Sequence, residues 1–437
     1  MDGGFAGILA RDEGLGREWV ARWLSSSSSS TPASSNVGYD DLAFQRWMKF
    51  KEAYSPRFVV DTIKSMPFNV RSCADPFGGS GTTALTCSLL GIPSVTIEVN
   101  PFLADMIEAK NVECNPLDLL NSMAEVFSIA NDLSVDLPTL LSRAPRTLCE
   151  PGVNGRFVYW GEALYRIMSL RGAIKQLPST AARKILWVLL GSILVEASNV
   201  IVNGKGRRYR GGWLSRKIGS DTVDALFQRS VQKAAYDLGR FVGMPRAGVT
   251  VIRGDARKKI YDIEEVDLII TSPPYPNSFD YTDVYNLELW VLGYLSSSGD
   301  NQNLRRSALT SHVQLKPTLR CSDLASSTLQ STIKALQIKR NNLWSSHIPE
   351  MVSSYFADLA DILKGAKCRL RTGGRAVIVI GDSCYSNTHI PSAQIISEMA
   401  KEIGLNVVNS TPIRSMRVSA QHGGRFGLDE TALTVQK

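Results

Sequence analysis

The sequence predicts an α/β protein with a mostly parallel sheet and a large, mostly helical insertion. Short apolar strands alternate with helical segments from residue 71 onward, which is the pattern typical of parallel sheets. A glycine-rich turn joins the first strand of this series to its first helix. Two long segments, 113–247 and 295–365, interrupt the alternation.

Each predicted element follows from its local pattern. The expected core strands are runs of apolar and β-branched residues that end in turn residues. They cover 71–77, 94–99, 248–255, 266–274 and 373–383, with a closing pair at 405–410 and 430–437. The expected helices between them cover 83–91, 100–110 and 392–404. Gly91 ends the expected helix 83–91, at the C-terminal capping position where glycine is preferred.

Composition places the chain among ordinary globular proteins. It has 437 residues and 47.9 kDa, with 44% hydrophobic and 21% charged residues, which excludes collagen-like, wholly disordered and coiled-coil classes. The apolar run at 185–195 is too short for a membrane helix. No secretory signal pattern opens the sequence, so we expect a cytoplasmic protein without a membrane partner.

Charge and cysteine content narrow the function. Lys and Arg outnumber Asp and Glu by 49 to 41, and the pI of about 9.1 favours a polyanionic partner. The seven cysteines are dispersed with no CxxC pair, and only four histidines are present. Zinc fingers and zinc-dependent deaminases need clustered ligands, so we expect no metal site. The dispersed cysteines are typical of reduced thiols in a cytoplasm.

The chain divides into four predicted parts. We expect a flexible N-terminal tail over 1–36, because 25–36 is a serine-rich linker, although 17–24 could form one or two amphipathic turns. The other parts are two halves of a core, separated by a helical insertion that is a candidate target-recognition region. They cover 37–112, 113–247 and 248–437, the last with a polar and basic insertion at 295–345.

The first chemical motif is DPFGGSGTT, from Asp75 to Thr83, between a strand end and a helix. Glycines let a ligand approach the backbone closely, and a helix N-terminus offers free N–H groups. A phosphate-binding loop needs a lysine after its glycines, but Thr82 and Thr83 follow Gly81 here. Alone, the motif fits either a ligand loop or a tight turn without a ligand.

Acidic residues follow two further strands. The second strand ends in Glu98, which is placed to bind a ribose hydroxyl pair, and the next ends in Asp255. Either residue alone would more often be a solvated carboxylate. With Asp75, they form three acids at successive strand ends after a glycine turn, which indicates a ligand that contains a nucleoside.

The most specific motif is TSPPY, from Thr271 to Tyr275, at the end of the apolar run VDLII. Its two prolines fix the backbone. A rigid loop with one hydroxyl, free carbonyls and an aromatic ring suits a flat heterocycle that carries an amino group. The alternative is a proline-rich loop after the strand that has no functional role, and the other motifs make this alternative the weaker one.

Together these motifs resemble the AdoMet-dependent DNA amino-methyltransferases, which modify the exocyclic nitrogen of cytosine or adenine. The resemblance covers about 39–110 and 248–437, and it implies a Rossmann-like, seven-stranded class I methyltransferase sheet whose last strand is antiparallel. It implies S-adenosyl-L-methionine as cofactor and double-stranded DNA as partner. The motif order departs from the usual one, since Asp75 precedes Ser272.

The resemblance also implies roles for individual residues. Glu98 would bind the ribose and Asp255 the adenine of AdoMet, while the segment 51–63 would complete the pocket at the methionine end. The implied cofactor residues are Asp75, Pro76, Phe77, Gly79, Gly81, Thr82, Glu98, Asp255, Ser55 and Pro56. The implied catalytic residues are Ser272, Pro273, Pro274 and Tyr275.

The predicted DNA contacts lie in the segment 203–217, which is rich in glycine, arginine and aromatic residues and has no acid. We expect it to be a loop that contacts phosphates or unstacked bases. Its candidates are Lys205, Arg207, Arg208, Arg210 and Arg216, and the alternative is a solvated basic surface. The basic stretch 304–320 is a second candidate.

Several functions stay open at this point. Ser before Pro-Pro accompanies cytosine-N4 methylation in this family, so Ser272 favours cytosine over N6-adenine methylation. An RNA or protein amide methyltransferase and a non-catalytic AdoMet- or nucleic-acid-binding protein are further alternatives. A restriction-modification or host-protection setting, with a separate cognate endonuclease, is also compatible with the motifs.

Overall fold

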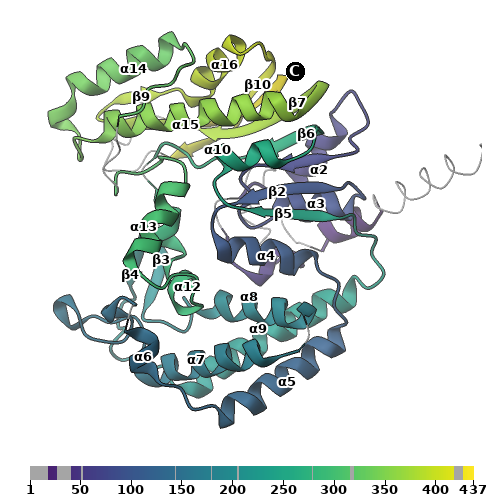
Figure 1. Ribbon diagram of the computed structural model, residues 1–437, viewed down its shortest axis with the longest axis vertical. Helices are drawn as coiled ribbons and strands as arrows, with labels where there is room; N and C mark the ends of the chain where they lie inside the picture. The colour runs from purple at the N-terminus through teal and green to yellow at the C-terminus, as the bar shows by residue number, and fades with distance from the viewer. Residues whose placement is uncertain are drawn as a thin grey trace, which may run out of the picture.

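A seven-stranded sheet forms the centre of the computed structural model (Figure 1). The structure describes residues 18–26, 41–50, 53–142, 144–178, 180–203, 206–277, 279–314, 319–417 and 427–437. The sheet order is β5-β2-β1-β6-β7-β11-β10. The strands are β1 (Cys73–Asp75), β2 (Ser94–Glu98), β5 (Val249–Arg253), β6 (Val266–Thr271), β7 (Leu370–Gly381), β10 (Asn406–Arg417) and β11 (Gly427–Gln436).

The strand directions complete the predicted topology. Neighbouring strands from β5 to β7 are parallel, whereas β11 runs antiparallel to both β7 and β10. This is the arrangement expected of a class I methyltransferase sheet, so the predicted fold class is confirmed. Because β1, β2, β5 and β6 are parallel, their carboxyl ends meet at one edge of the sheet, where ligands bind in open α/β folds.

Helices cover both faces of the sheet, and several begin with side-chain caps. Ser55 caps α2 (Pro56–Lys64), and Asn100 caps α4 (Pro101–Asn111) through bonds from two backbone N–H groups. One face packs on α2 and α3 (Thr82–Leu89), and the other on α15 (Ile348–Arg369) and α16 (Ser392–Glu402). Gly91, with φ +76°, follows α3 in the left-handed conformation that glycine tolerates.

The 113–247 insertion forms a helical layer that packs below α4 (Figure 1). Its helices are α5 (Pro116–Asp132), α6 (Leu137–Leu141), α7 (Gly161–Gln176), α8 (Thr180–Ile193) and α9 (Ser220–Arg240). Buried side chains of α5, α7, α8, α9 and α4 belong to one continuous apolar cluster. The insertion therefore shares its core with α4, which packs beside the sheet.

The predicted tail is wrong for residues 18–26. Residues 18–24 form a helix, and Trp23 is completely buried, with its indole N–H donating to Ala43 O at 2.9 Å. The large apolar area of tryptophan makes docking on the helical layer favourable. Residues 1–17 and 27–36 lie outside the described residues.

The second insertion has its own helices. They include α13 (Ser298–Ser307) and α14 (Ser327–Ile338). Two short helices, α11 (Tyr281–Val284) and α12 (Asn286–Val291), lie before the insertion and follow the TSPPY loop. Small elements complete the fold: α10 (Ala256–Lys259) and the hairpins β3 (Val200–Asn203) with β4 (Gly206–Tyr209) and β8 (Ser383–Tyr385) with β9 (Thr388–Ile390). Among the described residues, no helix has the length and apolar character needed to cross a membrane.

Candidate active site

A cavity of about 340 Å³ opens at the carboxyl ends of β1, β2 and β6. Ten of the fourteen residues predicted for the cofactor and catalytic roles border it. They are Asp75, Pro76, Phe77, Gly79, Thr82, Glu98, Asp255, Ser272, Pro274 and Tyr275. Motifs almost two hundred residues apart in the sequence therefore share one cavity.

Asp75 ends β1 and is almost completely buried. Its Oδ1 accepts hydrogen bonds from the Thr271 hydroxyl at 2.8 Å and from Phe77 N at 3.0 Å, and its Oδ2 accepts one from the Tyr54 hydroxyl at 3.2 Å. Burial raises the pKa of Asp75 to about 6, against the opposing effect of these donors. The carboxylate joins the two motifs at the floor of the cavity.

Glu98 ends β2 and holds the glycine turn. Its Oε2 accepts from Gly79 N at 2.7 Å, and its Oε1 accepts from Asn100 N at 2.8 Å. Burial raises its pKa to about 7, although both backbone donors favour the charged form. A carboxylate has about four lone-pair sites, so Glu98 can still accept bonds from a hydroxyl pair.

Asp255 caps α10 and is bound by a neighbouring guanidinium. Arg257 donates from Nε to Oδ1 and from a terminal nitrogen to Oδ2, both at 2.8 Å, and its backbone N–H also bonds Oδ1 at 3.0 Å. The same arginine forms an ion pair with Asp358 at 2.9 Å. Asp255 therefore reaches the cavity with most of its acceptor sites already in use.

The glycine turn leaves polar atoms without partners beside the cavity. Thr82 Oγ1 and Ser80 Oγ are buried, have no hydrogen-bond partner among the described residues, and belong to residues that border the cavity. Beneath them, Lys110 Nζ donates to Ser80 O at 2.8 Å, and burial lowers the pKa of Lys110 to about 7. Gly81 has φ +83° and does not border the cavity.

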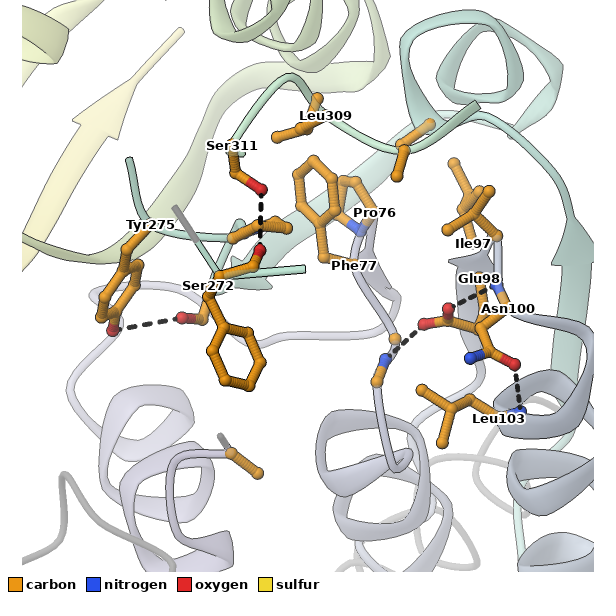
Figure 2. A pocket seen from close by; sticks show the side chains of 18 of the residues that line it. Pro76, Phe77, Ile97, Glu98, Asn100, Leu103, Ser272, Tyr275, Leu309 and Ser311 are labelled. Carbon is orange, nitrogen blue, oxygen red and sulfur yellow. Dashed lines mark hydrogen bonds between the residues drawn. The ribbon is translucent and has the colours of Figure 1, made fainter. Parts of the chain in front are cut away.

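The TSPPY loop forms the other end of the cavity (Figure 2). Ser272 Oγ lies 3.4 Å from the Tyr275 hydroxyl, which lies 2.6 Å from Glu430 Oε1. Pro274 borders the cavity but Pro273 does not. Figure 2 shows Tyr275 and Glu98 at opposite ends, with Pro76, Phe77 and Leu309 between them.

Several lining residues were not predicted. Ser55, which caps α2, and Pro56, its first residue, do not border the cavity, and the preceding Tyr54 lines it instead. The missed lining residues include Phe50, Leu304, Leu309, His312, Arg414 and Glu430. The only local signal for Tyr54 was its place in the motif segment, and the strand residues Arg414 and Glu430 carried none.

The segment after the TSPPY loop is fixed by a buried acid. Asp280 Oδ2 accepts from Arg305 Nε at 2.7 Å, and its Oδ1 lies 3.8 Å from His312 Nε2. Burial lowers the pKa of His312, so the imidazole favours its neutral form. Arg320, at the end of the second basic stretch, is paired with Asp358 and Asp361. These arginines of 304–320 hold the fold together.

The 203–217 segment is not a loop throughout, because part of it forms β4 of the hairpin with β3. The β-branched run that precedes it supplies the partner strand. Arg210 donates to Val195 O at 3.1 Å, and Arg216 donates to Glu196 O at 3.0 Å, so both bind the chain after α8. Arg208 is exposed, Arg207 lies 3.6 Å from Asp283, and Lys205 lies outside the described residues.

The residues at the glycine turn fit S-adenosyl-L-methionine. Gly79 has φ +53°, and a Cβ on it would lie 3.3 Å from Phe50 Cζ in the cavity wall, so both the backbone conformation and the tight contact favour glycine beside the cavity. Glu98 offers acceptors, Thr82 offers an unpartnered hydroxyl, and Ile97 and Leu309 supply apolar walls. The fold and this cavity are those expected of a class I methyltransferase, and S-adenosyl-L-methionine is the methyl donor that this class implies.

Known proteins with similar sequences are type II methyltransferases. The chain is 28% identical over 403 residues to type II methyltransferase M.AvaI, both from Nostoc sp. (strain PCC 7120 / SAG 25.82 / UTEX 2576) and from Anabaena variabilis, which covers 83% of this chain and 79% of the relative. It is 24% identical over 439 residues to type II methyltransferase M.BsoBI from Geobacillus stearothermophilus, covering 88% and 83%. The chain is thus similar to type II methyltransferases over most of its length.

Two other comparisons add little. No protein-family model matches the chain. The crystal structure of TehB from Haemophilus influenzae matches with 9% identity and a TM-score of 0.30, over 87% of this chain and 62% of that one.

Proposed function

We propose that this protein is a site-specific DNA methyltransferase that transfers a methyl group from S-adenosyl-L-methionine to N4 of a flipped-out cytosine. One observation carries the proposal: the TSPPY loop and the glycine turn border one cavity, with Ser272 at one end and Glu98 at the other. The similarity to type II methyltransferases supports the DNA substrate. A restriction-modification or host-protection setting, with a separately acting endonuclease, fits these relatives.

The cofactor end of the cavity binds and orients the methyl donor. When bound, S-adenosyl-L-methionine supplies an electrophilic methyl group on a sulfonium sulfur. In our proposal Glu98 accepts bonds from the ribose hydroxyls, and Asp255 accepts one from the adenine amino group with its remaining acceptor site. Asp75 keeps Tyr54 and Thr271 in place at the floor of the cavity.

The other end holds the target amine. An exocyclic amine is a poor nucleophile because its lone pair is delocalised into the ring. The Ser272 hydroxyl would accept one of its N–H bonds and a backbone carbonyl of the TSPPY loop the other, which directs the lone pair toward the methyl group. Pro273 is left out of this role because it does not border the cavity. Positioning of this kind can supply about 7–11 kcal/mol of the barrier reduction. The ammonium product is acidic enough to lose its proton to water, so no strong base is required.

The target base must leave the duplex to reach this cavity. Flipping costs a few kcal/mol of stacking and pairing, and the Tyr275 ring can replace part of the missing stacking. Arg207 and Arg208 on the β3–β4 hairpin are proposed to contact phosphates, with Lys205 beside them in the sequence. Arg210 and Arg216 are left out of this role, because backbone carbonyls already occupy them.

The test is the identity of the product. The purified protein is incubated with labelled S-adenosyl-L-methionine and either DNA or RNA, and the methylated nucleoside is identified by mass spectrometry. We expect N4-methylcytosine in DNA. If N6-methyladenine is the sole product, the target base is adenine and not cytosine. If label appears in RNA alone, the substrate is RNA and not DNA. Cofactor binding without transfer to either would favour a binding protein.

A further inference from the structure

A chain of three polar contacts leads away from Ser272 into the sheet. The Tyr275 hydroxyl lies between Ser272 Oγ, at 3.4 Å, and Glu430 Oε1, at 2.6 Å. Glu430 lies on β11 with its side chain only 3% exposed. Arg414 on β10 donates to Glu430 Oε1 at 2.9 Å, and its Nε lies 2.6 Å from Oε2 in an ion pair. Both residues border the cavity.

The chemistry of these groups fixes the direction of each hydrogen bond. A carboxylate beside a guanidinium can only accept, so the single proton of the Tyr275 hydroxyl points to Glu430. The 2.6 Å distance agrees with a bond to a charged acceptor. The Tyr275 oxygen can then only accept from Ser272. The 3.4 Å contact to Ser272 is long, as such bonds often are before substrate is bound.

Once the Ser272 proton points to Tyr275, the lone pairs of Ser272 Oγ remain as acceptors. An exocyclic amine presents two N–H donors, so it needs acceptors at this position. A free serine hydroxyl can rotate and present its proton instead, and that proton would then meet an N–H donor. The direction of the hydrogen bonds therefore decides whether Ser272 receives the amine or opposes it.

We infer that Glu430, paired with Arg414, is a positioning residue that acts through Tyr275 to hold Ser272 as a hydrogen-bond acceptor for the amino group of the target base. This inference rests on the proposed function and extends it to residues on the closing strands. It gives Tyr275 a second role, through its hydroxyl, in addition to stacking through its ring. It also explains why a carboxylate is buried at this point of β11, where an unpaired charge would be costly.

A merely structural role is the alternative, in which Glu430 and Arg414 only tie β10 to β11. The two roles differ in their coupling to Ser272. If Glu430 acts by orienting the Ser272 hydroxyl, replacing Glu430 should not slow methyl transfer further in a variant that lacks this hydroxyl. If it only supports the sheet, its replacement impairs the enzyme regardless of Ser272.

The experiment is a double-mutant cycle of Glu430→Gln and Ser272→Ala in the full chain, read by single-turnover methyl transfer to DNA. Cofactor affinity and thermal unfolding are measured in parallel. We expect Glu430→Gln to slow transfer on the order of tenfold in the wild-type background. In the Ser272→Ala background the same change should have an effect below about twofold, with cofactor affinity unchanged in both.

Two further variants keep the outcome decisive. Asp429→Asn is the matched control, because Asp429 precedes Glu430 on β11 and does not border the cavity, and it should transfer at the wild-type rate. Tyr275→Phe keeps the ring but removes the hydroxyl, and should show the same dependence on Ser272 if Glu430→Gln fails to fold. If the losses of Glu430→Gln and Ser272→Ala multiply in the double variant, the inference is overturned and the proposed function stands. The same holds if Glu430→Gln transfers methyl groups at the wild-type rate. A wild-type protein that transfers no methyl group to DNA would overturn the proposed function and the inference with it.

Discussion

The two ends of the cavity are built in different ways. At the Glu98 end, the contacts of the carboxylate are made with backbone N–H groups of Gly79 and Asn100, all within a short stretch of sequence. At the Ser272 end, the contacts are made between side chains of distant strands, up to Glu430 on β11. The Glu98 end, the proposed cofactor site, is thus a local structure, whereas the Ser272 end, the proposed base site, exists only when the sheet is complete.

The largest effect should come from crowding the local end. A Cβ on Gly78 would lie 2.3 Å from Thr96 Oγ1 and 2.9 Å from Ile107 Cδ1, so Gly78→Ala must displace the turn. We expect cofactor affinity, measured by calorimetry, to fall by about 100-fold or more, since the preorganised geometry is disrupted. Gly91→Ala is the control: it has no neighbour within 4 Å, so it should cost only about 1 kcal/mol of stability through its positive φ. Equal cofactor affinity in the two variants would refute the local construction of this end.

A smaller effect should follow at the distant end. Ser272→Ala removes the proposed acceptor for the amine, and we expect the single-turnover rate of methyl transfer to fall at least about tenfold, which corresponds to roughly 1.4 kcal/mol. Cofactor affinity should hardly change, because Ser272 and Glu98 lie at opposite ends of the cavity. A large decrease of cofactor affinity in this variant would mean that the two ends are not separable.

The pH dependence of cofactor binding should also separate the ends. Because the pKa of Glu98 in the free protein is raised to about 7, the carboxylate becomes protonated as the pH falls below 7. Protonation removes acceptor sites for the ribose hydroxyls, so cofactor affinity should decrease by up to about tenfold per pH unit below 7 and level off above it. Glu98→Gln should bind more weakly at pH 8 and lose the pH dependence attributable to this carboxyl. Calorimetry from pH 6 to 8 that shows identical profiles for both proteins would exclude Glu98 from the binding step.

The smallest expected effect concerns the hairpin outside the cavity. Arg207→Ala combined with Arg208→Ala should reduce the slope of log affinity for DNA against log salt by about 1 for each phosphate that is no longer neutralised. Arg210→Ala should instead lower thermal stability, because its guanidinium binds the Val195 carbonyl. Cofactor affinity should be the same as in the wild type for both. An unchanged salt slope in the double variant would leave the hairpin arginines as a solvated surface.

The same contrast explains what could be predicted from sequence. The parallel strands and the glycine turn depend on residues that are neighbours in the chain, such as the run that ends in Asp75 and the turn up to Gly81. The acids at strand ends could be placed because parallel strands end at one edge of a sheet. These features carry local patterns, and the predicted fold class is confirmed.

The rest could not be predicted because it depends on tertiary contacts. Glu430 lies in an ordinary strand sequence, and only the pairing of β11 with β7 and β10 brings it to Tyr275. Arg210 and Arg216 resemble phosphate ligands in the sequence because composition does not show which carbonyls a guanidinium will reach. Trp23 falls in the predicted tail because its docking surface comes from residues far along the chain.

The position of β11 in the sheet has a consequence for folding during translation. This strand follows the other six core strands in the chain, yet it lies between β7 and β10. On the ribosome, at about 5–20 residues per second, the segment that holds Glu98 emerges tens of seconds before the segment that holds Glu430. A nascent chain can therefore form the glycine turn early but lacks a wall of the proposed base pocket until translation has passed β11. Methylation activity should accordingly begin only after nearly all of this sequence has been translated.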